Sequence, residues 1–208
     1  MPGSKNNRRG GRGMYPKTNN LQHKSGKIRY ILPEYLEATE IQALIRSAPH
    51  AKAKLLMTFQ WRAGLRISEA LAIKASDITL DGDRPTIHVR QGKGRRDRLV
   101  PVHPKLVDAI QTAMAFGDFR RGPFFTVNRT TAWRWVKTAL RRATELGSIQ
   151  PGKYVGTHTL RHSAARHWLA HGIPINVAQK WLGHSSLQVT LRYLELLPDP
   201  AGDIARIP

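Results

Sequence analysis

Cysteine is absent from the 208-residue chain. Its absence excludes disulfides, zinc sites built on thiolates and cysteine nucleophiles. The sequence also lacks an uninterrupted apolar run long enough to cross a bilayer, and its N-terminus lacks the apolar segment of a secretory signal peptide. We therefore expect a protein that stays in the cytoplasm, where it is made, without a membrane partner.

Acidic residues are scarce: 14 Asp and Glu stand against 34 Lys and Arg, which gives a formal net charge of +20. A polyanionic partner is the simplest reason for a chain to carry so much self-repulsion. An anionic membrane surface is the weaker candidate, because no basic helix in the sequence has a broad apolar face. The charge therefore predicts a protein that binds nucleic acid.

Composition divides the chain into three segments. Residues 1–29 are rich in Gly, Asn, Lys and Arg and contain no acidic residue, so they cannot bury enough apolar surface to fold alone. We interpret them as a disordered basic arm that contacts phosphates; a tail that only keeps the protein soluble is the alternative. The arm residues expected to bind are Arg8, Arg9 and Arg12. Residues 30–197 are expected to form one domain, and the proline-containing residues 198–208 a C-terminal tail.

Apolar residues recur at helical spacing through most of residues 30–197. They predict helices that begin near Thr39 and then cover residues 51–63, 68–74, 105–114, 130–146, 158–170, 175–182 and 187–196. Residues 86–90 and 98–102 instead alternate like two antiparallel strands, joined by the basic tip 91–96. The pattern predicts a mostly α fold with a small antiparallel β-sheet (α+β).

Two basic residues suit phosphate chemistry. Arg66 follows a helix-ending glycine amid apolar neighbours, where its guanidinium could donate two hydrogen bonds to a phosphate. An ion pair with Glu69 is the alternative. Lys93, at the hairpin tip, suits a mobile donor that gives a proton to a leaving alkoxide; a plain phosphate contact is its alternative. The hairpin carries further candidates for nucleic-acid contact: Arg90, Arg95 and Arg96.

His158 and Arg161 lie three residues apart near a helix start, so both can face one site. The imidazole can move protons while the guanidinium fixes a phosphate oxygen. The alternative is a pair of surface residues beside Thr157 as the helix cap. His158 and His162 have a spacing that metal sites use, but no Glu stands beside them and Arg161 disfavours a cation. We therefore expect no metal and no other cofactor.

His184 and Tyr193 lie in the last predicted helical segments. Gly183 can end one helix and a following serine can cap the next, which puts His184 at a corner; a turn histidine without function is the alternative. Tyr193 lies one step off a leucine stripe, so it need not be a core residue. A phenol has a pKa of about 10 and needs cationic neighbours to act as a nucleophile. The alternative is a half-buried tyrosine with its hydroxyl in water.

The order and spacing of these residues resemble the tyrosine recombinase (phage integrase) family. The matching segments are GLRISEAL, GKGRRDRLVPV, HTLRHSAARHWLAHG and LGHSSLQVTLRYL, and the resemblance covers residues 32–196. It implies the fold of a tyrosine recombinase catalytic domain. Only the basic arm precedes Leu32, as in the short fimbrial phase-variation invertases. The catalytic residues that the resemblance implies are Arg66, Lys93, His158, Arg161, His184 and Tyr193.

The resemblance also implies a reaction: site-specific cleavage and rejoining of DNA without metal or ATP. Tyr193 would form a 3′-phosphotyrosine, the two arginines and His184 would bind the phosphate oxygens, Lys93 would protonate the leaving 5′ oxygen, and His158 would help move the tyrosine proton. The implied partner is double-stranded DNA, bound by a homotetramer on synapsed sites near the nucleoid. The alternatives are relaxation of DNA in the manner of a type IB topoisomerase, or a non-catalytic DNA-binding accessory protein.

Overall fold

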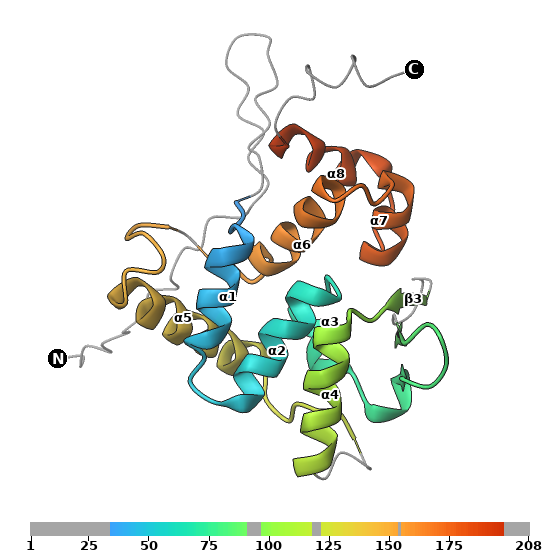
Figure 1. Ribbon diagram of the computed structural model, residues 1–208, viewed down its shortest axis with the longest axis horizontal. Coiled ribbons are helices and arrows are strands. Elements are labelled where there is room, and N and C mark those ends of the chain that lie inside the picture. The colour runs from blue at the N-terminus through green and yellow to red at the C-terminus, as the bar shows by residue number, and fades with distance from the viewer. Residues whose placement is uncertain (1–33, 91–96, 118–121, 154, 198–208) are drawn as a thin grey trace, which may run out of the picture. The chain divides into compact units, whose positions relative to one another are not determined.

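The computed structural model describes residues 34–90, 97–117, 122–153 and 155–197 (Figure 1). Several predictions lie outside the described residues. They concern the arm 1–29 with Arg8, Arg9 and Arg12, the hairpin tip with Lys93, Arg95 and Arg96, and the tail 198–208.

The structure confirms a mostly helical fold with a small antiparallel sheet. Its α-helices are α1 (Ala38–Arg46), α2 (Ala51–Arg62), α3 (Ile67–Ala72), α4 (Pro104–Phe116), α5 (Arg129–Glu145), α6 (Thr159–Ala170), α7 (Ile175–Leu182) and α8 (Leu187–Leu191). Short 3-10 turns are η1 (Ala75–Asp77) and η2 (Leu194–Leu196), and the strands are β1 (Ile78–Thr79), β2 (Thr86–Val89) and β3 (Arg98–Pro101). Within the described ranges, no helix combines the length and apolar character that a membrane span requires.

The sheet has the strand order β1-β2-β3, with both pairs antiparallel. In β2 and β3 the register pairs Ile87 with Val100, and both side chains are buried on the core face. His88 points to the other face, where its Nε2 lies 2.9 Å from a carboxylate oxygen of Asp97. The sequence pattern missed β1, because two residues are too few to show an alternation.

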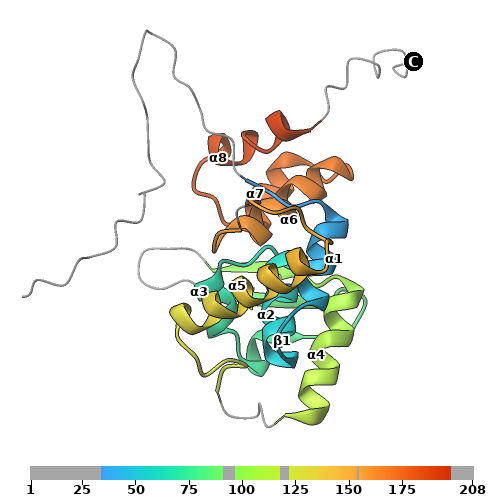
Figure 2. The same ribbon diagram turned by 90° about the vertical axis from the view of Figure 1, so that its left-hand side faces the viewer.

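Helix α2 is the central element and contacts α1, α3, α4, α5 and α6. Phe59 packs in one apolar cluster with Ile87 of β2, whereas Met57 packs in a second cluster with Val136 of α5. Neither Phe59 nor Met57 exposes any surface, and each contributes about 1.5–3 kcal/mol relative to an exposed side chain. At one end of this body lie α6, α7 and α8 (Figures 1 and 2). Arg161 is on α6, whereas His184 and Tyr193 lie in the turns that follow α7 and α8.

The C-terminal segment corrects two expectations. The single helix predicted over 187–196 is broken, because α8 ends at Leu191 and a 3-10 turn follows from Leu194. The sequence left open whether Tyr193 is a core residue, with a half-buried tyrosine as the alternative. That alternative is wrong, because Tyr193 is only 1% exposed and packs in a cluster with Leu182, while Leu191 and Leu194 are each 41% exposed. A 3-10 turn is wound more tightly than an α-helix, so its side chains point in different directions. The Tyr193 phenol therefore points into the core, whereas a continuous α-helix would have placed it beside the apolar stripe.

Candidate active site

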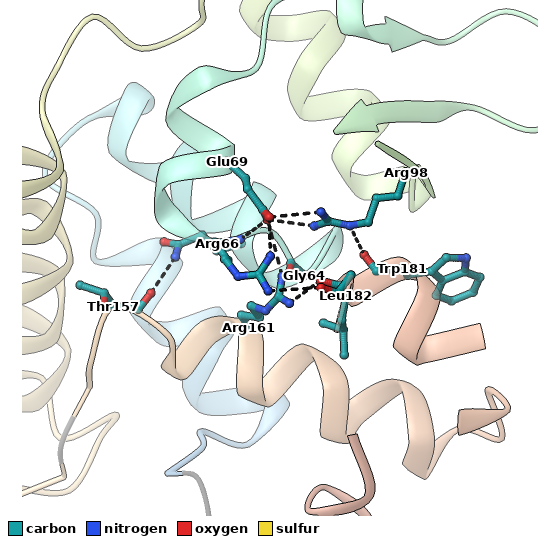
Figure 3. A network of polar contacts seen from close by, with 10 residues as sticks. Gly64, Arg66, Glu69, Arg98, Thr157, Arg161, Trp181 and Leu182 are labelled. Atoms are coloured by element: carbon teal, nitrogen blue, oxygen red, sulfur yellow. Dashed lines mark hydrogen bonds and ion pairs between the residues drawn. The ribbon is translucent and has the colours of Figure 1, made fainter. Parts of the chain in front are cut away.

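The C-terminal end of α7 is bound by three arginines from other parts of the chain. A helix leaves its last carbonyl oxygens without partners inside the helix, and their partial negative charge attracts cations. Here three consecutive carbonyls each accept a hydrogen bond from a different guanidinium. The pairs are Trp181 with Nε of Arg98 at 2.7 Å, Leu182 with Arg161, and Gly183 with Arg66 at 3.3 Å. The end of α7 therefore fixes the positions of all three cations (Figure 3).

Gly64 positions Arg161 from the opposite side. Its carbonyl oxygen accepts a hydrogen bond from Arg161 at 2.7 Å. The backbone of Gly64 has φ +60°, and a Cβ added there would lie 2.7 Å from the Cη2 atom of Trp168. Only glycine fits both the left-handed conformation and this close approach. Two residues later, Arg66 precedes the first residue of α3.

Glu69 joins the three arginines through one carboxylate. It accepts hydrogen bonds from the guanidinium of Arg66 at 2.6 Å and from Arg98 at 3.1 and 2.8 Å, and it lies 3.6 Å from Arg161. Burial alone would raise the pKa of Glu69, but the hydrogen bonds and charge of Arg98, a backbone N–H of Arg66 and the charge of Arg161 lower it to about 2. The carboxylate is therefore ionised at neutral pH.

The cluster keeps an excess of positive charge. Burial and the neighbouring Arg66 lower the pKa of Arg161 to about 9, so Arg161 remains a cation at neutral pH. Three guanidinium charges facing one carboxylate leave a surplus of two positive charges. The side chain of Arg66 is 25% exposed and that of Arg161 is 3% exposed. The ion pair between Arg66 and Glu69, considered above as an alternative to phosphate binding, is present and still leaves this surplus for an anion.

Tyr193 lies beside this cluster and its hydroxyl is held by a histidine. The hydroxyl oxygen is 2.7 Å from Nδ1 of His162. Burial raises the pKa of Tyr193 to about 12, although the charges of Arg161 and Arg66 act in the opposite direction. Burial, the nearby His158 and the charge of Arg161 lower the pKa of His162 to about 4. At neutral pH the pair therefore consists of a neutral phenol and a neutral imidazole.

His184 stands at the corner that the sequence predicted. Gly183 ends α7 in the left-handed conformation, and the side chain of Ser186 caps α8. Nδ1 of His184 lies 2.9 Å from Oγ1 of Thr190, and the imidazole stacks on the ring of Tyr193 with 6.2 Å between centroids. Burial and the charges of two arginines lower the pKa of His184 to about 3, so its imidazole is neutral in the protein without DNA.

His158 occupies the cap position of α6, so the alternative that placed Thr157 there is wrong. Its exposed ring lies 6.0 Å from the ring of His162, between centroids. Partial burial and the charge of Arg161 lower the pKa of His158. Arg161 itself is 2% exposed, so it is not the surface residue of that alternative.

The structure thus gathers five of the six predicted catalytic residues at one place: Arg66, His158, Arg161, His184 and Tyr193. The sixth, Lys93, lies outside the described residues. Arg90, expected to bind nucleic acid, donates a hydrogen bond to Asp77 at 2.7 Å and its side chain stays 64% exposed. Within the described part of the chain, no three His, Asp or Glu side chains form a group that could hold a metal ion.

Sequence reasoning missed three contributors to the site: Glu69, Arg98 and His162. Glu69 was considered only as the partner of one arginine, and Arg98 only as a strand residue. His162 was considered only as a metal ligand. Its position beside Arg161 in the chain was the available signal, since consecutive residues at a helix start can both reach a neighbouring element.

The arrangement of helices around the small sheet is that of tyrosine recombinase catalytic domains. The crystal structure of XerA recombinase superposes with a TM-score of 0.70 and 27% identity, over 86% of this chain and 67% of that one. The catalytic domain of bacteriophage HP1 integrase gives a TM-score of 0.62 and 25% identity, over 84% of this chain and 94% of that one.

Sequence comparison agrees with the fold. The profile of the phage integrase family matches residues 34–199, and the chain therefore belongs to the phage integrase family. A tyrosine recombinase of Thermosipho africanus is 32% identical over 183 residues, which are 83% of this chain. The chain spans 61% of the length of that relative.

Proposed function

We propose that this chain carries the catalytic centre of a site-specific DNA recombinase, which cuts and rejoins double-stranded DNA through a 3′-phosphotyrosine. The observation that carries the proposal is the position of the Tyr193 phenol beside a cluster of arginines with two surplus positive charges. A phosphodiester fits such a cluster, because its oxygens are anionic and gain charge during nucleophilic attack. The net charge of +20 favours the same polyanionic partner.

Each step of the proposed reaction forms one phosphorus–oxygen bond and breaks another. The Tyr193 oxygen attacks the phosphorus, the phenol passes its proton to a neighbouring histidine, and the bond from phosphorus to the 5′ oxygen breaks. Lys93 gives a proton to that leaving oxygen. A 5′ hydroxyl from the second DNA strand then attacks the phosphorus and gives its proton to the neutral Lys93, while the bond from phosphorus to the Tyr193 oxygen breaks. A phosphodiester is restored, so the energy of the original bond is kept and no ATP is consumed.

In the proposed reaction the two arginines and His184 stabilise the negative charge of the phosphate oxygens. Arg66 and Arg161 donate hydrogen bonds to the non-bridging oxygens, and His184 adds one from its Nε2 atom, because its Nδ1 atom is held by Thr190. Carbonyls at the end of α7 and the Glu69 carboxylate hold the two arginines in position before DNA binds. Donors that are already oriented stabilise a transition state without a cost of reorganisation during the reaction.

The remaining partners are proposed from the family and the charge. We propose that the protein acts in the cytoplasm at the nucleoid as a homotetramer on two synapsed sites, and that residues 1–29 bind further phosphates. Sedimentation of the protein with its duplex tests the tetramer. Replacing Arg8, Arg9 and Arg12 together by Ala should reduce the slope of log affinity against log salt by about 0.9 for each phosphate that the arm no longer neutralises.

A covalent trapping experiment tests the proposed activity. DNA selected from a genomic library with the Tyr193→Phe variant supplies the target site. A duplex of that site, nicked so that the released fragment diffuses away, should then trap the wild-type protein as an adduct stable to SDS. Tyr193→Phe should bind the duplex and form no adduct. Retention of DNA without any adduct by the wild type would instead indicate a DNA-binding accessory protein, and relaxation without strand exchange a topoisomerase.

A further inference from the structure

We propose that His162 is the general base that takes the proton from the Tyr193 hydroxyl, the role that the family resemblance suggested for His158. The inference rests on the proposed recombinase function. It assigns a further catalytic residue, because His162 touches the reacting oxygen itself.

The contact geometry distinguishes the two histidines. Nδ1 of His162 lies 2.7 Å from the Tyr193 oxygen, within the range of a strong hydrogen bond. The ring of His158 is next in line, with its centroid 6.0 Å from that of His162. Only 1% of Tyr193 is exposed, so bulk water does not reach the phenol to take its proton. The proton therefore leaves through a protein side chain, and His162 is in position to receive it.

The charge state of His162 suits this role. The groups that face it are His158 at the cap of α6, Arg161 on α6, and His184 and Tyr193 from the segment after α7. Burial, the nearby His158 and the charge of Arg161 lower the pKa of His162, so its imidazole is neutral at physiological pH. With its own hydrogen on Nε2, the ring presents the Nδ1 lone pair to the phenol hydrogen.

The proton step follows directly. As the Tyr193 oxygen bonds to phosphorus, its proton moves to Nδ1 of His162, which becomes an imidazolium beside the anionic phosphate. The negative charge of that phosphate stabilises the imidazolium, which the free protein disfavours. In the rejoining step the phenolate leaves phosphorus and recovers the proton from His162. His158, at the surface end of this pair, can exchange protons with solvent.

Single-turnover cleavage of the nicked duplex tests the assignment with three variants. His162→Ala should cleave about 10²–10⁴-fold more slowly than wild type, the usual effect of a positioned base. His162→Asn, which keeps a polar contact but accepts no proton, should be equally slow. Raising the pH should recover part of the rate of His162→Ala, because truncating the imidazole opens a path by which hydroxide reaches the phenol. His158→Ala should lose less, and all variants should bind uncut duplex like wild type.

A substrate with sulfur in place of the bridging 5′ oxygen separates the base from the acid. Its thiolate leaves without a proton, so it should restore the rate of Lys93→Ala and leave His162→Ala slow. Wild-type rates for His162→Ala, or recovery by His162→Asn, would overturn the proposal in favour of a purely positioning residue. Faster cleavage by His162→Ala would show that His162 restrains the tyrosine instead. Failure of the wild type to form any adduct would refute the recombinase function itself.

Discussion

Arg98 and Glu69 join β3 to α3 through two parallel hydrogen bonds, at 3.1 Å from Nη1 to Oε1 and at 2.8 Å from Nη2 to Oε2. Their side chains are only 8% and 10% exposed. The same guanidinium donates to the carbonyl of Trp181. Arg98 therefore links the strand that leaves the hairpin tip to both α3 and the end of α7.

Removing Arg98 should destabilise the fold strongly. Arg98→Ala leaves the Glu69 carboxylate with less compensation in a buried place, and losing one partner of a buried pair costs about 3–5 kcal/mol. The midpoint of urea unfolding measures the change. Arg98→Lys should recover only part of it, because an ammonium cannot donate in the two-point geometry.

The exposed pair of Arg141 and Glu145 provides the matched control for that measurement. Its side chains are 64% and 57% exposed, with the charged atoms 2.7 Å apart. Arg141→Ala should change the free energy of unfolding by less than about 1 kcal/mol. Equal effects of Arg98→Ala and Arg141→Ala would contradict the structural role of Arg98.

Gly64→Ala should be costly for two separate reasons. The backbone at φ +60° disfavours a Cβ by about 1–2 kcal/mol, and the new atom would meet Trp168 at 2.7 Å, which adds about 1–3 kcal/mol of overpacking. Gly147→Ala isolates the first reason, because Gly147 has φ +68° and open space around its Cβ position. Thermal unfolding should therefore separate the two variants. A Gly64→Ala protein as stable as Gly147→Ala would show that the Trp168 ring moves aside freely.

Stability should fall as the pH drops below about 6.5. The pKa values of His162 and His184 are lowered to about 4 and about 3, so the folded protein keeps both imidazoles neutral while the unfolded chain takes up protons. Stability from this source is fully present above the unfolded pKa of about 6.5 and is lost as the pH falls toward the folded values. The slope is at most about 1.4 kcal/mol per pH unit for each imidazole.

Urea unfolding at pH 7, 6 and 5 measures this slope. His162→Asn and His184→Asn should each flatten it. A protein that becomes more stable between pH 6.5 and 5 would contradict the buried, neutral state of the two histidines.

Much of the fold was predictable from periodicity alone. The expected helix over 51–63 is found as Ala51–Arg62, and the expected strands over 86–90 and 98–102 as β2 and β3. These elements are long enough for one buried face to repeat several times. The break after Leu191 was not predictable, since the same leucines fit a continuous helix equally well.

The site was predictable in its residue types and less so in its connections. The sequence predicted Arg66, Arg161, His184 and Tyr193 as site residues, and the fold brings them together. It gave no sign that Arg98 bonds to the carbonyl of Trp181, 83 residues away, because such a contact depends on how β3 and α7 pack. The burial of Tyr193 also depends on packing, so a one-dimensional pattern left its position in or outside the core open.

The burial of the Tyr193 hydroxyl affects what happens when the protein meets DNA that is not its target. A protein with a net charge of +20 meets far more random duplex than target. The Tyr193 hydroxyl is buried and keeps its proton up to about pH 12. If Tyr193 is the nucleophile, as we propose, the protein therefore does not cut the random DNA that it meets, and only a site that brings its phosphate to the Tyr193 oxygen beside the arginines is cleaved.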